Sequence, residues 1–238
     1  MNHDAAMAVV DGTEILWAAH SERYSKVKND HYLNWGIVNE AMTYGPFNKV
    51  VYYEKPWLKK TRQLYATQWG EAFSYTELPQ WHLDHFNIKI DQYVKHHDSH
   101  AAAGYYTSPF REATILTVDA IGEWDTVSIS TADKIWIERK ETIKYPHSIG
   151  ILYSAFTHRC GLKPAEEEYI LMGMAAYGDP TVYRKLSRQM GKQFFMHDYA
   201  WISEKNSVHM KRNLQRGLPN HMYKEYSKFD VAAAAQNQ

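Results

Sequence analysis

The chain has 238 residues, of which 45% are hydrophobic and 14% aromatic, a composition that supports a folded core and argues against disorder. Lys plus Arg and Asp plus Glu both number 27, so the net charge of zero argues against a general role on nucleic acid or on membrane surfaces. Cys160 is the single cysteine, which excludes an intramolecular disulfide and a cysteine-rich zinc site. No apolar run approaches the roughly 20 residues of a membrane helix and no apolar signal region follows Met1, so we expect a soluble, cytoplasmic protein.

The first part of the chain predicts short strands and helices in alternation. Asp11-Gly12 separates two apolar runs and predicts a β-hairpin. Apolar side chains at helical spacing then predict a helix that Gly45-Pro46 stops. The predicted elements are strands at 5–10 and 14–19, a helix at 32–43, a strand at 49–53, a helix at 57–73, and an ambiguous segment at 78–94 that ends in a short strand.

His96 and His100 are four residues apart, so a helix that begins here places both imidazoles on one face. Neutral imidazole nitrogens on adjacent turns suit a divalent transition metal. Asp98 and Ser99 are expected to cap this helix, and three alanines after His100 favour its continuation. The competing interpretation is a capped helix with two histidines whose hydrogen bonds are satisfied.

An apolar run at 114–118 ends in Asp119 and predicts a buried strand with this carboxylate at its C-terminal end. Two histidines from a helix and one aspartate from a strand end would form a metal site with open coordination positions. His96, His100 and Asp119 are therefore the candidate metal ligands.

The remainder of the chain predicts a β-meander followed by helices. A helix at 148–159 has a predicted apolar face, and Cys160-Gly161 ends it. Residues 181–228 contain ten Lys/Arg and three Asp/Glu, so their local charge is +7. This charge fits either a solvated, partly irregular excursion or a surface that faces an anion or a partner. The further elements are strands at 127–130 and 135–143 and the opening of a helix at 230–238, and the predicted apolar face comprises Ile151, Leu152, Ala155 and Phe156.

Four ordered blocks of residues resemble the carbamoyltransferase family that includes nodulation-type and antibiotic-tailoring O-carbamoyltransferases. The likeness runs over nearly the whole chain and is weaker at 54–90 and 181–228. The blocks are His3-Asp4-Ala5-Ala6 with the hairpin and Glu22-Arg23, His96 to Ala102, Ser108-Pro109-Phe110 through Asp119 to Glu123-Trp124, and Ser148-Ile149-Gly150 through Met172-Gly173-Met174 to Gly178.

The resemblance implies an α/β protein with an actin-like fold of the RNase-H-like, Kae1 type, in which helices flank a mixed β-sheet. It also implies that residues 1–238 are the N-terminal part of a Kae1-like domain. The family's second subdomain and its YrdC-like domain are absent from this sequence. We therefore expect an incomplete fold and a partner, such as a second chain that carries the C-terminal half.

The same resemblance implies a metal-dependent transfer reaction. Family members bind a metal, reported as iron, through two histidines and an aspartate that match His96, His100 and Asp119, and a further aspartate ligand comes from the later subdomain. The family histidine matched by His3 is thought to act as a base. The YrdC-like domain makes carbamoyl-adenylate from carbamoyl phosphate and ATP, and the carbamoyl group passes to a hydroxyl or amine of a small-molecule acceptor.

Other polar residues are candidates for binding the substrates. Glu123 is a candidate for positioning the acceptor, and a simple turn carboxylate is the competing interpretation. Arg23, Lys26 and Lys28 are candidates for binding phosphate, against the more common case of a solvated basic loop.

Two other functional interpretations stay open beside an active carbamoyltransferase. One is an inactive fragment or a split subunit that needs a partner chain, and the other is a metal-dependent hydrolase that uses the same three ligands and a metal-bound water. The sequence departs from the family pattern at Ala120, where a glycine is usual, and at Ile170, where a lysine is frequent. With the absent C-terminal half, these departures predict that the isolated chain does not transfer carbamoyl groups by itself.

Overall fold

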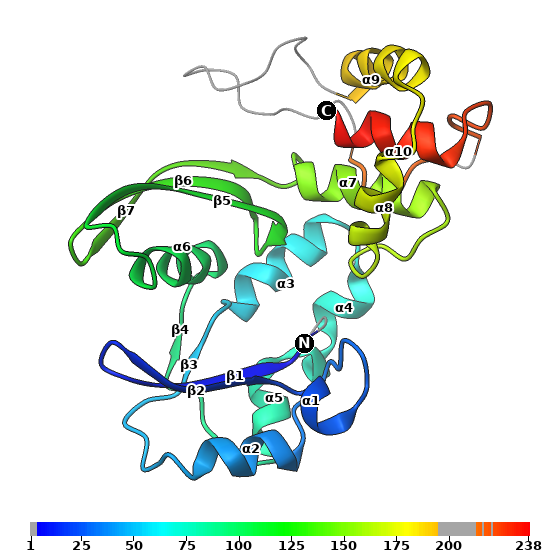
Figure 1. Ribbon diagram of the computed structural model, residues 1–238. Helices are drawn as coiled ribbons and strands as arrows, with labels where there is room; N and C mark the ends of the chain where they lie inside the picture. Colours follow the sequence, from blue (N-terminus) through cyan, green and yellow to red (C-terminus); the bar gives the residue numbers. More distant parts are fainter. Residues whose placement is uncertain (1–3, 195–212, 216, 220) are drawn as a thin grey trace. The chain divides into compact units, whose positions relative to one another are not determined.

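The computed structural model describes residues 4–194, 213–215, 217–219 and 221–238, and it divides into two compact units on either side of the Ser99–His100 bond. Both units combine helices with small sheets (Figure 1), so the predicted α/β class is confirmed. The finer actin-like assignment stays a prediction. Within the described ranges, no helix has the length and apolar character required to cross a membrane.

The first unit contains two small two-stranded sheets. The predicted hairpin is confirmed, because β1 (Ala6–Asp11) and β2 (Glu14–His20) pair antiparallel around Gly12, whose φ of +56° a glycine adopts without strain. Strands β3 (Val51–Tyr52) and β4 (Gln92–Tyr93) pair in parallel. The helical elements of this unit are α1 (Glu22–Ser25), α2 (Trp35–Met42), α3 (Pro56–Tyr65), α4 (Trp69–Phe73), η1 (Tyr75–Glu77) and α5 (Pro79–Asp84).

Helix α2 anchors the core of the first unit. The Asn34 side chain caps α2 by accepting a hydrogen bond from the Ile37 backbone N–H at 3.2 Å, and the apolar face of the helix is buried. The core that this face joins comprises Ile37, Val38, Tyr52, Leu83, Ile88 and Ile90.

The single helix predicted at 57–73 is wrong, because the structure divides it into α3 and α4. Thr67 adopts a left-handed backbone conformation with φ of +59°, which ends α3 after Tyr65. The Gln68 backbone N–H then donates to the Gln63 carbonyl at 2.9 Å, a closing bond typical of a helix C-terminus. No glycine or proline lies between Tyr65 and Trp69, where the helix breaks, and Gly70 lies within α4.

The second unit contains the predicted β-meander, which the structure confirms as one antiparallel sheet in the order β5-β6-β7. Helix α6 begins in the first unit and continues into the second. The strands and helices are α6 (His96–Tyr106), β5 (Glu112–Gly122), β6 (Asp125–Asp133), β7 (Trp136–Lys144), α7 (Ile149–Arg159), α8 (Glu168–Ala175), α9 (Pro180–Phe194) and α10 (Lys228–Gln236).

Strand β5 is more exposed than its apolar sequence predicts. Thr117 is buried, but its neighbours Leu116 and Val118 are 62% and 50% exposed, so the expectation of a buried strand is wrong. The exposed fraction alternates along β5 because successive side chains point to opposite faces of the sheet. In the part of the chain that the structure describes, only one of these faces is covered at this strand.

Helices α7 to α10 form an apolar core in the second unit. Phe156 is fully buried in α7, and its ring packs edge-on against Phe194 of α9 at a centroid distance of 5.7 Å and alongside Tyr223 at 6.2 Å. The predicted apolar face of α7 and its end at Cys160 are both confirmed. In α10, Val231 to Ala235 are all buried, since small side chains allow close helix packing.

The expectation of a partly irregular excursion over 181–228 is wrong for its first part. Residues 180–194 form α9, which buries Leu186, Met190 and Phe194 against the core. Its cations lie on the opposite face, as in any amphipathic helix. Residues 195–212 lie outside the described part, so the proposed anion-facing surface stays a prediction.

The packing of Phe156 generates a test of stability. We expect Phe156→Ala to lower the free energy of unfolding by about 3–5 kcal/mol, because it leaves a cavity between α7 and α9. Phe110→Ala is the matched control, since Phe110 is 65% exposed, and its effect should stay within about 0.5 kcal/mol. Urea unfolding followed by circular dichroism measures both variants, and equal effects would contradict the assignment of this core.

Candidate metal centre

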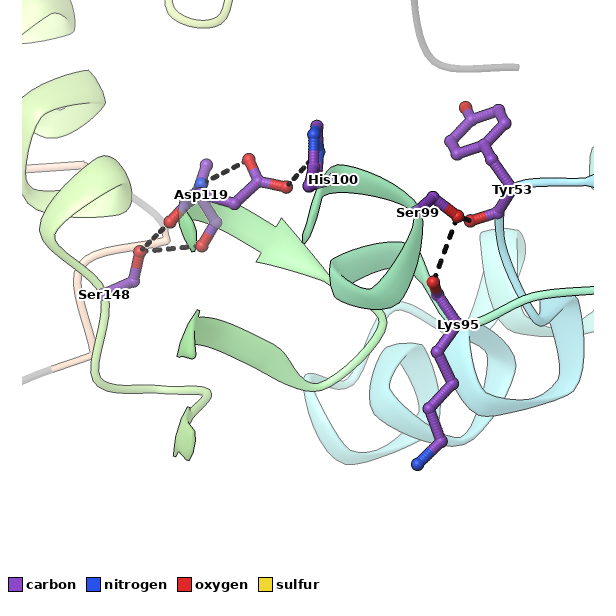
Figure 2. A network of polar contacts seen from close by, with 7 residues as sticks. Tyr53, Lys95, Ser99, His100, Asp119 and Ser148 are labelled. Carbon is purple, nitrogen blue, oxygen red and sulfur yellow. Dashed lines mark hydrogen bonds and ion pairs between the residues drawn. The ribbon is translucent and has the colours of Figure 1, made fainter. Parts of the chain in front are cut away.

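Helix α6 places the two candidate histidines on one face. His96 is its first residue and His100 lies one turn later. The expected caps are wrong, because α6 begins before Asp98 and Ser99, which lie in its first turns. Ser99 Oγ instead lies 3.0 Å from the Tyr53 carbonyl oxygen and 3.1 Å from the Lys95 carbonyl oxygen (Figure 2), where it bonds to backbone.

The far end of α6 is fixed to the sheet by two tyrosines. The Tyr105 hydroxyl donates to the Arg111 carbonyl at 2.6 Å, just before β5. The Tyr106 hydroxyl donates to the Ile135 carbonyl at 2.8 Å, in the turn between β6 and β7. These bonds hold α6 beside the sheet, so the position of His100 relative to β5 is determined within the second unit.

Asp119 lies in a β-bulge near the C-terminal end of β5. Regular pairing with β6 runs as far as Val118 opposite Val127 and resumes only at Gly122 opposite Asp125. Asp119 is therefore the first residue of the bulge, while the strand continues to Gly122. Bulges of this kind redirect a side chain away from the regular alternation of the strand.

The structure brings the three predicted ligands together. His100 Nε2 lies 3.7 Å from Asp119 Oδ2 (Figure 2), and one potential ligand atom from each of His96, His100 and Asp119 lies within 4.8 Å of the others. Atoms bound to one ion at about 2.1 Å are at most about 4.2 Å apart, so small side-chain rotations bring this set to bonding distance. The side chain of His100 is 55% exposed, which leaves the cluster accessible from solvent.

The electrostatics of the cluster favour a positive charge beside Asp119. The hydrogen bond to Asp119 raises the pKa of His100 above its usual value, partial burial opposes this shift, and the charge of the carboxylate adds to it. The second carboxylate oxygen, Oδ1, accepts a hydrogen bond from the Ala120 backbone N–H at 2.6 Å. A metal ion would take the place of the His100 proton between the two side chains.

The chemistry of the donor set fits a divalent transition metal. Two imidazoles and one carboxylate are the ligands of many Zn²⁺ sites and of non-haem Fe²⁺ sites with open positions. The metal site itself stays a prediction.

His3 and Glu123, the other predicted site residues of the reaction centre, are not members of the three-ligand cluster. His3 lies outside the described residues. Glu123 is in the turn after β5, with φ of +63° and a side chain that is only 4% exposed, so it is a buried carboxylate rather than a solvated one.

The three predicted phosphate-binding cations lie in and after α1, in the first unit. Arg23 and Lys28 are highly exposed and lie 4.0 Å and 3.6 Å from the carboxylate of Glu22. Lys26 Nζ donates to the Arg23 carbonyl at 2.7 Å. Intraloop contacts of this kind fit a solvated basic loop, and binding of phosphate here stays a prediction.

Two residues that contact the backbone of Asp119 were not predicted from the sequence. Ser148 Oγ lies 2.7 Å from the Ala120 carbonyl oxygen and 3.3 Å from the Asp119 carbonyl oxygen. Gly150 lies directly against the Asp119–Ala120 peptide. The available signals were a serine just before an apolar helix and an unexplained glycine in the first turn of that helix. Ala120 itself does not adopt a positive φ, so its backbone does not require the usual glycine.

Comparison with known proteins identifies the family. Residues 53–237 match the family model described as carbamoyltransferase N-terminus. The chain belongs to this carbamoyltransferase family. The resemblance drawn from the sequence is thereby confirmed, and the matched range includes all three candidate metal ligands.

Individual relatives are similar over a limited part of their length. The chain is 30% identical over 207 residues to the uncharacterized protein sll1178 of Synechocystis, a match that covers 75% of this chain and 34% of the relative. It is 25% identical over 209 residues to the nodulation protein NolNO of Sinorhizobium fredii, covering 79% of this chain and 29% of the relative. It is 33% identical over 142 residues to the uncharacterized protein MJ1058 of Methanocaldococcus jannaschii, covering 51% of this chain and 23% of the relative. The chain thus spans about a third or less of the length of these relatives.

The geometry of the cluster predicts that metal binding depends on its histidines. We expect the double variant His96→Ala, His100→Ala to lose bound Fe²⁺ or Co²⁺, because two of three donors are removed. The matched control is His20→Ala, His31→Ala, since both of these histidines are exposed in the first unit. Metal content after anaerobic loading and desalting, measured by mass spectrometry, decides the outcome, and equal content in all three proteins would exclude the site.

Proposed function

We propose that this chain supplies the metal-binding part of a carbamoyltransferase that acts on carbamoyl-adenylate. The observation that carries this proposal is the cluster of His96, His100 and Asp119 within 4.8 Å, inside the segment that matches the carbamoyltransferase family. In this proposal residues 1–238 are the N-terminal part of a Kae1-like domain with an actin-like fold.

The reaction transfers a carbamoyl group from a mixed anhydride. A hydroxyl or amine of a small-molecule acceptor attacks the carbamoyl carbonyl carbon, the bond from this carbon to the phosphate oxygen breaks, and AMP leaves. Negative charge builds up on the carbamoyl oxygen and on the phosphate as this happens. A bound divalent ion, which we propose is Fe²⁺, supplies Lewis-acid stabilisation of such charge.

The residues of the chain have distinct proposed tasks. His96 and His100 hold the ion as neutral imidazoles, and Asp119 contributes a negative charge that balances part of the charge of the ion. His3 accepts the proton of the attacking hydroxyl or amine, because an imidazole titrates near neutral pH. Glu123 positions the acceptor.

The exposed cations of the first unit complete the proposal. Arg23, Lys26 and Lys28 bind phosphate groups of the adenylate or of its precursors. Their exposure leaves them available to a ligand, and Glu22 holds two of them in one loop.

The supply of carbamoyl-adenylate requires a second component. Relatives of this chain are about three times as long as the segment that it matches. We propose that a C-terminal region like theirs makes carbamoyl-adenylate from carbamoyl phosphate and ATP, and that it reaches the cluster from a partner chain. Such a region would also contribute the remaining ligand and walls of the site, which exclude water from the reactive carbonyl.

Reconstitution tests the proposed function. The 238-residue chain is assayed with carbamoyl phosphate, ATP, Fe²⁺ and a panel of hydroxyl and amine acceptors, alone and with a C-terminal chain derived from a longer relative. We expect carbamoylated product from the mixture and none from either chain alone, and His100→Ala should abolish it whereas His31→Ala should not.

The same assay distinguishes the alternatives. Product from the isolated chain at the rate of the mixture would contradict the need for a partner. Release of a hydrolysis product without ATP or carbamoyl phosphate would favour a metal-dependent hydrolase. No product from the mixture, together with normal metal binding, would indicate an inactive subunit.

A further inference from the structure

Ser148 and Gly150, at the start of α7, are not ligands in the cluster but contact the backbone that carries Asp119. Figure 2 shows the Ser148 side chain directed at this part of β5, on the opposite side of Asp119 from His100. The contacts of these two residues determine how firmly the Asp119 carboxylate is held.

Gly150 allows an approach that no other residue permits. A Cβ atom added to Gly150 would lie 2.6 Å from Cα and 2.7 Å from N of Ala120, and 2.9 Å from the carbonyl oxygen of Asp119. Real Cβ atoms essentially never come closer than 3.0 Å to such atoms. Because the opposing atoms are backbone, a side chain at 150 must push α7 and the bulge apart.

Ser148 binds the carbonyl oxygen of the next peptide, Ala120–Ile121, through its hydroxyl group. Its Oγ accepts the Ile151 backbone N–H at 3.0 Å, which caps α7, and lies 2.7 Å from the Ala120 carbonyl oxygen, to which it donates. Ser148 is 2% exposed, so water does not compete for these bonds. Capping of α7 and restraint of the bulge therefore depend on the same atom.

The start of α7 contacts β5 where the regular register of the sheet is interrupted. The pairing of β5 with β6 shifts between Val118 and Gly122, and the Asp119–Ala120 backbone lies within this shift. The start of α7 is itself fixed, since the fully buried Thr126 hydroxyl donates to the His147 carbonyl. A well-anchored helix start thus contacts the backbone of the bulge that carries Asp119.

We propose that Ser148 and Gly150 are positioning residues, which hold the backbone of Asp119 and Ala120 so that the Asp119 carboxylate is preset to share a divalent metal ion with His100. This inference rests on the proposed function, because it takes the cluster to be a metal site. Residues that orient a metal ligand through its backbone typically change metal affinity about 10–100-fold when they are replaced.

The first experiment replaces the glycine. Co²⁺ is titrated into the purified chain under anaerobic conditions, and binding is followed by its visible absorption and by calorimetry. We expect Gly150→Ala to weaken Co²⁺ binding by about 10–100-fold. Gly70→Ala is the matched control, since a Cβ there meets no atom within 4 Å, and it should leave the affinity unchanged.

The second experiment replaces the serine, and it decides the question if Gly150→Ala fails to fold. We expect Ser148→Ala to weaken Co²⁺ binding by at least about tenfold and Ser148→Thr, which keeps the hydroxyl, to restore most of it. Ser227→Ala separates capping from positioning, because Ser227 caps α10 through the Asp230 N–H at 3.0 Å and does not contact the bulge. It should leave Co²⁺ binding unchanged.

A readout without metal separates the two proposals. In the metal-free protein, NMR should show faster hydrogen exchange of the Ala120 amide in Gly150→Ala and Ser148→Ala, with unchanged exchange in the paired part of β6. If the unaltered chain binds no Co²⁺, the proposed function fails, and this exchange alone decides the positioning role. If the unaltered chain binds Co²⁺ and both variants bind it equally well, the positioning role is overturned while the proposed function stands.

Discussion

The packing of Phe156 determines where α7 lies, and the geometry of the candidate site depends on that position. Its ring is enclosed by Phe194 and Tyr223, so α7 has little freedom to move along or away from its neighbours. The N-terminus of the same helix contacts the Asp119–Ala120 peptide through Gly150. A core formed by apolar side chains thus fixes, through one rigid helix, the backbone of a candidate metal ligand.

The other side of the cluster depends on α6. The i, i+4 spacing of His96 and His100 is a property of the helix, and the tyrosine hydroxyls at its far end fix the helix to the ends of the strands. Asp119 then approaches His100 from a bulge, where the chain is released from the regular register of the sheet. Two consecutive elements, α6 and β5, therefore present their ligands to one another because separate sets of contacts position each of them.

The family match and the donor set of the cluster are two independent observations that support the same proposal. The family match covers residues 53–237 and would hold for any arrangement of side chains. The distances among the ligand atoms follow from the fold and indicate no particular reaction. Their coincidence in one segment is the reason to propose carbamoyl transfer rather than metal binding alone.

The sequence by itself determined the features that depend on local patterns. Asp11-Gly12 predicted the hairpin, alternation predicted the meander, and the apolar spacing of 148–159 predicted α7 and its buried face. The spacing of His96 and His100 and the position of Asp119 after an apolar run could also be predicted from the sequence, because each is a short-range property. These local signals were sufficient to name the three residues that the structure brings together.

Only the tertiary structure decided features that depend on contacts between distant residues. The left-handed Thr67 divides a helix that periodicity predicts as continuous, and the exposed fractions of Leu116 and Val118 depend on which face of β5 is covered. Helix α6 begins at His96, so Asp98 and Ser99 lie within the helix and do not cap it as predicted. The contact of Gly150 with Ala120 joins positions 30 residues apart, and no local pattern reveals it, because the required glycine is defined by the space that another segment of backbone leaves.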